Sequence, residues 1–502
     1  MKIVHLYMRI CIAAYCIFFL SNAKVLGQTK SLQQLQSEHV DLRFGMFIHF
    51  NINTYHHGWG NDRVDPKIFN PTALDCSQWA KAAKSAGIKY ALLTTKHHDG
   101  FALWPSKQIP PNGKTPYTIA QSSVPNKDVV KEYVDAFRKE GIQPGFYFSM
   151  WDVANGVGGP YNKSDSIDWP KVKPYILGQI TELLGGKYGE IPIFVIDGYM
   201  WKMGHKQIPI QEIRGLIKSL QPNCLLVDHN GGTPWDVDLV YFEEPLKIVA
   251  PDGNTIAACQ GQTISKDWFW DNTSADSTKL KSLKDIVNHL NRLEPLYTNF
   301  IINCPPNRSG LMDTAIVNRL AQVGRAWKPN LSRAPLPQQA PIIEYPLTPI
   351  SASATSGNAL LAIDGLNDGP RGPRYQTLWE SDSIMPQAIT LDLGSIYSNV
   401  DMLMYLPRRE PGNTKGNITS YKIYASTDGK SFKPVAEGKW APDPTVKRAQ
   451  FAPQTARYLR FEALEANGGV AVIGELTVGS NKTKITTDTQ KTALDDWQLV
   501  QL

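Results

Sequence analysis

The chain has 502 residues, of which 42% are hydrophobic, 20% charged and 10% aromatic, and its formal net charge is +6. This composition is typical of globular proteins and excludes the disordered, fibrous and membrane-bundle classes. The charge is mild for the length, and no run of Lys and Arg interleaved with aromatic residues is present to follow a phosphate backbone, so we expect no nucleic-acid partner. A chain this long predicts at least two domains.

The first residues are typical of a secretory signal. Two basic residues precede an apolar run over 10–20, and small residues come directly before Gln28. The run is too short to span a bilayer comfortably, and no later stretch reaches the ~20 apolar residues of a membrane helix. We therefore expect a signal peptide over 1–27 and an exported protein, periplasmic or secreted, with no stable membrane span. A lipoprotein is less expected, because the bulky Tyr15 directly precedes Cys16.

From about residue 43 to 327, apolar runs typical of strands alternate with segments of helical period. The expected strands cover 44–50, 90–95, 145–150, 191–196, 224–228, 239–242 and 300–303, and the expected helices cover 78–86, 129–141, 175–184, 210–220, 283–293 and 315–323. Strands joined by crossover helices form a parallel sheet, and this many of them predict an α/β fold closed into a TIM-like (β/α) barrel. A doubly wound open sheet is the alternative, although no Gly-rich phosphate turn follows the first strand.

A Pro-rich stretch over 334–345 is typical of a semi-rigid linker. Beyond it the helical period disappears and short strands are expected at 388–393, 400–406, 420–425, 449–451, 458–463 and 475–478. This pattern predicts an antiparallel all-β jelly-roll sandwich. The expected organisation is a barrel domain over 28–333, the linker, a sandwich over 346–480 and an unassigned tail over 481–502.

Four cysteines remain after the signal, namely Cys76, Cys224, Cys259 and Cys304. They are scattered along the chain without a C-x-x-C spacing, which indicates neither a zinc site nor a disulfide scaffold. We expect buried thiols and no metal site.

In barrel enzymes the reacting groups lie at the carboxyl ends of the strands. Polar and aromatic residues stand at or just after the ends of six expected strands: His49; His97, His98 and Asp99; Tyr147, Trp151 and Asp152; Asp197; Asp228 and His229; Glu243 and Glu244. Any one of them alone is more often structural, as a helix cap or a partner for the backbone. Their coincidence at successive strand ends favours an active site.

Two carboxyl groups at strand ends suit the hydrolysis of a glycosidic bond. Asp197 follows an apolar run and precedes Gly198, and the next helical pattern begins too far downstream for Asp197 to cap it, so we expect a fixed nucleophile. A retaining glycosidase needs a second carboxyl group roughly 5–5.5 Å from the first. Glu243 or Glu244 could supply it. Adjacent strand residues point to opposite faces, so only one should face the site, and the sequence leaves both open.

Large aromatic residues are concentrated near the loops expected at the barrel mouth. They are Trp59, Phe101, Trp104, Trp151, Trp201, Trp268 and Trp270. Sugars stack their apolar faces on such rings, whereas most single tryptophans serve in core packing. We take Trp59, Trp201 and Trp268 as candidate substrate-binding residues.

At these residues the chain resembles glycoside hydrolase family 29, the α-L-fucosidases. The string Lys-His-His-Asp-Gly-Phe over 96–101 matches the most specific motif of the family, and 43–50 is similar to its first strand. Trp79 and 86–90 match the helix and strand entry between them. The chain departs from the family in two places: Phe-Asn replaces Trp-Gly after the first strand, and His-Gly-Trp-Gly over 57–60 stands where Glu-Trp-Tyr is common.

The resemblance implies a retaining exo-α-L-fucosidase that acts through a covalent glycosyl-enzyme intermediate, without metal or organic cofactor, on a fucosylated oligosaccharide or glycoconjugate. It also implies that His49, His97 and His98 bind fucose hydroxyls, that Tyr147 lines the site and that Asp197 is the nucleophile. The departures leave two alternatives, a related glycosidase acting on α-L- or β-D-galactosides and a non-catalytic glycan-binding protein.

The region from about residue 346 to 480 resembles the discoidin or coagulation factor 5/8 type C domain. The segments that carry the resemblance are 362–365, 378–381, 389–394, 423–429 and 456–461. Domains of this type bind glycans in some proteins and brace a catalytic domain in others, and both roles stay open. Its fusion to such a barrel resembles the subgroup that prefers branched α-1,3/1,4-linked fucose.

Overall fold

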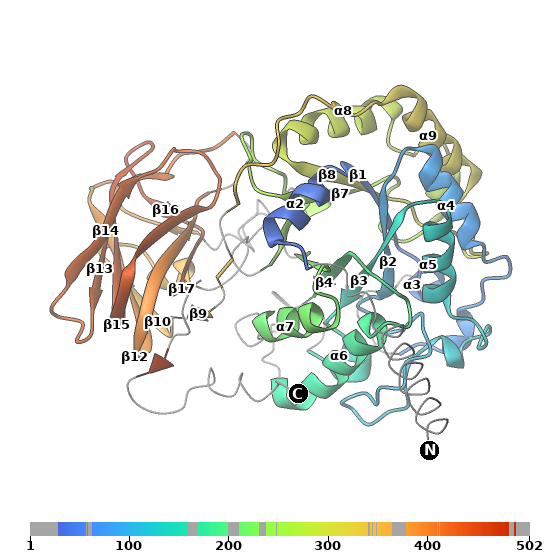
Figure 1. The fold of residues 1–502 in the computed structure, drawn as a ribbon, viewed down its shortest axis with the longest axis horizontal. Helices are drawn as coiled ribbons and strands as arrows, with labels where there is room; N and C mark the ends of the chain where they lie inside the picture. Colours follow the sequence, from blue (N-terminus) through green and yellow to red (C-terminus); the bar gives the residue numbers. More distant parts are fainter. Residues whose placement is uncertain are drawn as a thin grey trace, which may run out of the picture.

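The computed structural model describes residues 29–56, 58, 63–158, 168–198, 210–229, 237–246, 248–339, 342–343, 345–347, 349–363, 378–408, 410, 412–480 and 486–487. Within them, an eight-stranded parallel barrel is followed by antiparallel sheets that lie beside it (Figure 1). The predicted fold class is therefore confirmed. The expected signal peptide and the candidate residues Trp59 and Trp201 lie outside the described residues. No described helix has the length and apolar character needed to cross a membrane.

The barrel is closed by pairing of its first and last strands, with Phe44 of β1 opposite Phe300 of β8. Its strands are β1 (Phe44–Ile48), β2 (Tyr90–Lys96), β3 (Gln143–Ser149), β4 (Ile193–Asp197), β5 (Leu225–Asp228), β6 (Leu239–Glu243), β7 (Ala258–Thr263) and β8 (Thr298–Asn303). The helices that surround them in Figure 1 are α4 (Cys76–Ser85), α5 (Val129–Lys139), α6 (Trp169–Leu184), α7 (Ile210–Leu220), α8 (Leu283–Leu293) and α9 (Thr314–Ala326).

The strands are buried on both faces, which explains their continuous apolar runs. Side chains such as Phe47, Tyr147 and Tyr241 fill the barrel interior, whereas Phe44 packs in the layer between strands and helices. The large interior rings need space from small neighbours. A Cβ atom at Gly261 would lie 1.7 Å from the Tyr241 hydroxyl oxygen, so a glycine is required there.

Two elements of the barrel domain have no apolar run or period that predicts them. Strand β7 has the sequence Ala-Cys-Gln-Gly-Gln-Thr, which contains polar residues and no apolar run, although the strand is almost wholly buried. Helix α2 (Leu32–Val40), which packs against the barrel before β1, has only four buried residues. Helix α6 begins six residues before the predicted start, because Pro170 lies in the first turn, where the missing N–H costs no hydrogen bond.

The C-terminal domain is an antiparallel sheet in the order β14-β13-β15-β12-β17-β9 with a separate β11-β16 pair. The strands are β9 (Tyr345–Leu347), β10 (Ser351–Ala354), β11 (Trp379–Glu380), β12 (Gln387–Leu406), β13 (Ile418–Ser426), β14 (Lys433–Lys439), β15 (Lys447–Ala466), β16 (Val472–Ile473), β17 (Glu475–Ser480) and β18 (Thr486–Thr487). The two expected strands at 388–393 and 400–406 are one strand, β12. Its pairing with β15 shifts register between Asp392 and Met402, where the alternation breaks.

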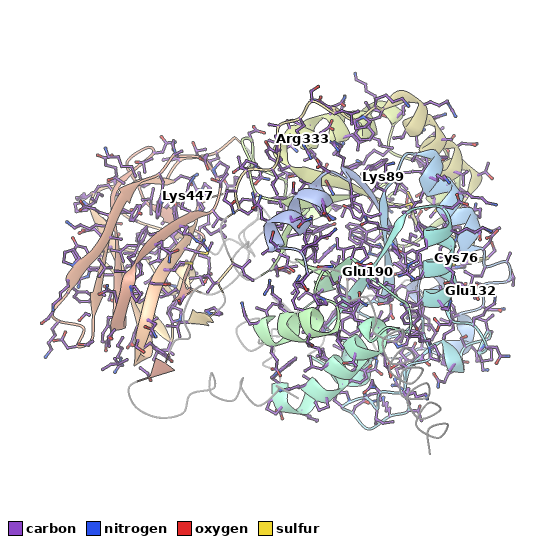
Figure 2. All side chains as sticks on the ribbon, in the orientation of Figure 1. Cys76, Lys89, Glu132, Glu190, Arg333 and Lys447 are labelled. Atoms are coloured by element: carbon purple, nitrogen blue, oxygen red, sulfur yellow. The ribbon has the colours of Figure 1, made fainter. Side chains whose placement is uncertain are left out.

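Residues 333–339, where the expected linker begins, contact the base of the barrel, where the strands begin. Gln339 accepts a hydrogen bond from the Ala257 backbone and donates one to the Thr255 carbonyl, just before β7. Arg333, labelled in Figure 2 where the chain passes from barrel to sandwich, forms an ion pair with Asp41 at 2.6 Å and lies over the Tyr297 ring. Residues 333–339 therefore lie at the end of the barrel opposite the carboxyl ends of the strands.

Candidate active site

The carboxyl ends of the barrel strands gather the chemically active side chains. Ser149, Asp197, Glu243 and Asn303 end β3, β4, β6 and β8, and His49, His97, His98 and His229 follow β1, β2 and β5 by one or two residues. All of these side chains are buried except that of Glu243, which is 13% exposed. Among the described residues, no cluster of three or more His, Cys, Asp or Glu is arranged to hold a metal ion.

Asp197 is a buried carboxylate surrounded by donors. The Tyr147 hydroxyl donates a hydrogen bond to its Oδ2, and the same oxygen lies 3.4 Å from Nδ1 of His229 and 3.7 Å from Nε2 of His98. Burial acts to raise the pKa of Asp197, but the two imidazoles and the tyrosine hydrogen bond outweigh it and hold the pKa below its ordinary value. Asp197 is therefore ionised at neutral pH.

A hydrogen bond to Ser149 fixes the orientation of the His98 ring. The Ser149 hydroxyl donates its one proton to the Trp151 carbonyl at 2.8 Å, so at 2.7 Å it accepts from Nδ1 of His98. Its other nitrogen, Nε2, points toward Oδ2 of Asp197 at 3.7 Å. The His98 imidazole thereby helps to lower the pKa of Asp197.

His49 is oriented by the same kind of arrangement. The Asn303 amide donates to the Trp268 carbonyl at 2.6 Å, which turns its oxygen to accept from Nδ1 of His49 at 2.7 Å. Burial lowers the pKa of His49 to about 3, so the ring is neutral and its Nε2 is an acceptor. The Trp268 ring lies 4.9 Å from the His49 ring, at a tilt of 36°.

His97 is held by aromatic contacts. Its ring stacks on Tyr147 with centroids 5.4 Å apart and an interplanar angle of 11°, and the edge of Phe269 meets it at 5.0 Å. The His98 ring lies 4.2 Å away. Burial first, and then the neighbouring imidazoles, keep the pKa of His97 well below its ordinary value, so this ring is also neutral.

The two consecutive glutamates point to different parts of the molecule. Oε2 of Glu243 lies 3.8 Å from Nδ1 of His229, on the same side as Asp197. Oε1 of Glu244 lies 2.7 Å from Nε2 of His289 on α8, and its Oε2 accepts from Gln260 at 2.7 Å. Only Glu243 therefore joins the cluster at the barrel mouth.

A buried polar network supports the loop that carries the two histidines. The Lys96 ammonium, fully buried, lies 3.2 Å from Asp152 and 2.9 Å from the Gln179 amide oxygen. Tyr175 donates to the same Asp152 oxygen at 3.1 Å. Gly100 must be a glycine, because its φ is +75° and a Cβ there would lie 1.9 Å from Asp152 Oδ1.

Asp99 completes the turn after β2. Its Oδ1 accepts from the Phe101 backbone at 2.8 Å, and burial raises its pKa to about 7. This contact is local to the turn, so Asp99 shapes the loop that places His97 and His98.

The sequence-based candidates that the structure brings together at the barrel mouth are His49, His97, His98, Tyr147, Asp197, Glu243 and Trp268. Glu244 lies outside this group, on His289. The structure adds Ser149, His229, Phe269 and Asn303, which were not chosen as candidates. For Ser149, His229 and Asn303 the position at or directly after a strand end was the available signal, whereas Phe269 lies beyond the end of β7. The hydrogen bonds that give Ser149 and Asn303 their roles depend on the fold alone.

Comparisons with known proteins agree with this architecture. Residues 51–330 match the sequence model of the α-L-fucosidase family, and residues 347–476 match that of the F5/8 type C domain. Alpha-L-fucosidase 1 of Arabidopsis thaliana is 32% identical over 312 residues, which cover 56% of this chain and 57% of that protein. Plasma alpha-L-fucosidase of Homo sapiens is 22% identical over 304 residues, covering 52% of this chain and 55% of that protein. The chain thus spans about half the length of these curated relatives.

A solved structure has a similar fold. It is a glycoside hydrolase 29 family member from an unknown rumen bacterium, with a TM-score of 0.50 and 21% identity, and the match covers 89% of this chain and 99% of that one. The family match extends over more than half of the chain. This chain therefore belongs to the α-L-fucosidase family of glycoside hydrolases and carries an F5/8 type C domain after its barrel.

Proposed function

We propose that the chain is a retaining exo-α-L-fucosidase that removes fucose from oligosaccharides or glycoconjugates. The observation that carries the proposal is the pairing of two carboxyl groups at the barrel mouth: Asp197 and Glu243 both lie within 4 Å of one nitrogen of His229. Family membership supports fucose as the sugar. The activities named for the relatives support the same reaction.

The spacing of the two carboxyl groups favours retention of anomeric configuration. Because Oδ2 of Asp197 and Oε2 of Glu243 share that nitrogen, they are at most about 7 Å apart, whereas inverting enzymes separate their carboxyl groups by roughly 6.5–9.5 Å and retaining enzymes by roughly 5–5.5 Å. This bound favours the shorter separation that retaining enzymes have.

The proposed reaction has two steps. Asp197, ionised as its environment requires, attacks the anomeric carbon, and Glu243 transfers its proton to the departing glycosidic oxygen. A water molecule then gives a proton to Glu243 and attacks the same carbon, which releases fucose and restores the Asp197 carboxylate. Tyr147 donates to Asp197 before attack, so its hydrogen bond also orients the nucleophile.

Neutral histidines supply the proposed recognition of the sugar. Nε2 of His49 is an acceptor with fixed direction, suited to a ring hydroxyl. The His97 ring lies between the His49 and His98 rings, and all three are proposed contacts of the sugar. Trp268 offers a ring for the apolar face of the sugar. Trp59 and Trp201 remain proposed contacts from the sequence. We also propose that the protein acts after export, as the expected signal segment over 1–27 suggests.

Product analysis tests the proposed function. Purified protein and its Asp197→Ala variant are incubated with fucosides in α-1,2, α-1,3, α-1,4 and α-1,6 linkage and with α-L- and β-D-galactosides, and products are identified by mass spectrometry. We expect fucose from the wild type alone, with α-1,3/1,4-linked branches cut fastest. Release of galactose but not fucose would replace the proposed substrate. Glycan binding without any release would contradict catalysis.

The anomeric outcome is read separately. Proton NMR of the first product formed from an aryl α-L-fucoside should show α-L-fucose before mutarotation. Initial formation of the β anomer would contradict the retaining mechanism while leaving the substrate assignment intact.

A further inference from the structure

His229 lies between the two carboxyl groups of the site. It directly follows β5 and is buried, and its Nδ1 is 3.4 Å from Oδ2 of Asp197 and 3.8 Å from Oε2 of Glu243. Both distances are too long for strong hydrogen bonds in the present arrangement, yet a small movement of either carboxyl group brings it into contact. One donor is therefore within reach of two acceptors that stand on different strands.

The ring of His229 is fixed in place from several sides. It stacks on Tyr241 with centroids 4.1 Å apart at 22°, and the rings of Phe47 and Tyr147 meet it edge-on at 5.8 and 5.6 Å. Its backbone N–H donates to the Ile196 carbonyl at 2.9 Å, next to the nucleophile. Tyr241 itself occupies the space that Gly261 leaves open. The imidazole is thus positioned by packing and does not depend on its carboxylate partners for orientation.

Two carboxyl groups, those of Asp197 and Glu243, face the His229 ring. The phenols of Tyr147 and Tyr241 stay neutral, because burial raises the pKa of each well above its ordinary value. The imidazoles of His49 and His97 stay neutral because burial lowers the pKa of each. His98 reaches the same Asp197 oxygen from the other side.

In the proposed reaction, on which this inference rests, negative charge changes place. When Asp197 bonds to the anomeric carbon, the electron pair of the breaking bond goes to the departing oxygen, which takes the proton of Glu243. Asp197 is then a neutral ester and Glu243 is a carboxylate. Hydrolysis reverses both changes, because water gives its proton to Glu243 and its oxygen to the sugar. The charge therefore moves from Asp197 to Glu243 and back in each cycle.

We propose that His229 is a positioning residue that stabilises this charge on whichever carboxyl group carries it, so that it serves both half-reactions. The imidazole ring of His229 does not flip between the two carboxyl groups. Only the carboxyl group that is charged draws close to Nδ1, and the other relaxes. This role differs from that of His98 and Tyr147, which contact Asp197 and serve only when the nucleophile is charged.

The test separates the two half-reactions. His229→Ala removes the donor, whereas His229→Asn keeps an N–H at nearly the same place. Each variant is assayed with an aryl α-L-fucoside that has a good leaving group, for which hydrolysis of the intermediate limits kcat, and with a fucosyl oligosaccharide, for which its formation limits kcat. His39→Asn, a buried histidine at the opposite end of the barrel, is the matched control. Thermal melting verifies that each variant is folded.

We expect His229→Ala to lower kcat by about 10²-fold on both substrates, as the loss of a preorganised donor does, with KM changed less than about threefold. His229→Asn should recover part of that loss. Burial raises the pKa of Asp197 and the His229 imidazole opposes this effect, so the acidic limb of the kcat/KM profile should move to higher pH in His229→Ala. The control, His39→Asn, should change neither kcat nor the pH of the acidic limb.

Three results would overturn the inference. They are a loss confined to one half-reaction, a loss that appears in KM alone, and an equal loss in the His39→Asn control. If His229→Ala does not fold, the same criteria are applied to His229→Asn, for which wild-type kcat and an unshifted limb would contradict the role. If the wild type releases no fucose, the proposed function itself is wrong. If the wild type is active and the His229 variants have the same kcat, only the proposed role of His229 is wrong.

Discussion

Buried histidines lie at both ends of the barrel, and they have different roles at the base and at the mouth. At the base, His39 of α2 lies against the Cys259 sulfur at 3.3 Å and the Tyr90 ring at 4.8 Å, where the strands begin. At the mouth, His49 is oriented by an amide and His229 lies beside two carboxyl groups. Burial lowers the pKa of both His39 and His49 to about 3.

Burial and a shifted pKa therefore do not distinguish the site from the base. The mouth differs because two carboxyl groups, those of Asp197 and Glu243, lie among its histidines. At the base the thiol of Cys259 is kept protonated, since burial raises its pKa to about 12, and the contacts close the barrel. The difference predicts which substitutions affect chemistry and which affect stability.

The largest expected effect follows removal of the nucleophile. Asp197→Ala should lower kcat on fucosides by at least about 10⁴-fold, because it removes the group that forms the covalent intermediate. Thermal melting should stay close to that of the wild type. His39→Asn is the comparison at the base, where we expect a lower melting temperature and a kcat within about twofold of wild type. Wild-type turnover by Asp197→Ala would contradict the assignment of Asp197 as the nucleophile.

The second effect separates the adjacent glutamates. Glu243→Ala should lower kcat/KM by about 10³-fold on oligosaccharides, and much less on aryl fucosides whose leaving group needs no proton. Glu244→Ala should keep turnover within about threefold of wild type. The measurement is kcat/KM on both substrates for both variants. A larger loss for Glu244→Ala would mean that the acid/base had been placed on the wrong residue.

The third effect concerns the phenol that donates to Asp197. Tyr147→Phe removes a hydrogen bond to a charged group and should lower kcat/KM about tenfold. Burial raises the pKa of Asp197 and the Tyr147 hydrogen bond helps to lower it, so the acidic limb of activity should move to higher pH in this variant. A limb that stays in place while activity falls would show that Tyr147 acts on the sugar alone.

The smallest effect is on stability and lies outside the site. Burial raises the pKa of Glu244 but the His289 hydrogen bond outweighs it, and burial lowers the pKa of His289 but the bond to Glu244 outweighs it. The pair stabilises the fold above the ordinary pKa of Glu, 4.5, and below that of His, 6.5, and this contribution is lost as pH falls or rises through the shifted values.

Glu244→Gln should therefore cost about 1 kcal/mol, or roughly 2 °C in melting temperature, between those pH values, and less at pH 9. Melting curves of the variant and the wild type across pH measure this. A difference that grows toward pH 9 would contradict the ion pair.

Much of the barrel was predictable, because strands buried on both faces leave apolar runs between amphipathic helices. Strand β7 was not predictable, since Gln260 and Gly261 fit neighbours that only the fold brings near. The Tyr241 ring fills the space beside Gly261. In the site, Asp197 and His98 stood out at strand ends and in a specific motif. Choosing between Glu243 and Glu244 required α8, whose His289 takes one of the two.

Covalent trapping tests directly whether Asp197 is the nucleophile. The protein is incubated with a 2-deoxy-2-fluoro-L-fucosyl fluoride, which forms the glycosyl-enzyme faster than water removes it, and the labelled peptide is sequenced by mass spectrometry. We expect one label per chain, on Asp197, and none in Asp197→Ala. A label on another carboxyl group, or fucose release by a wild type that takes no label and yields the inverted anomer, would contradict it.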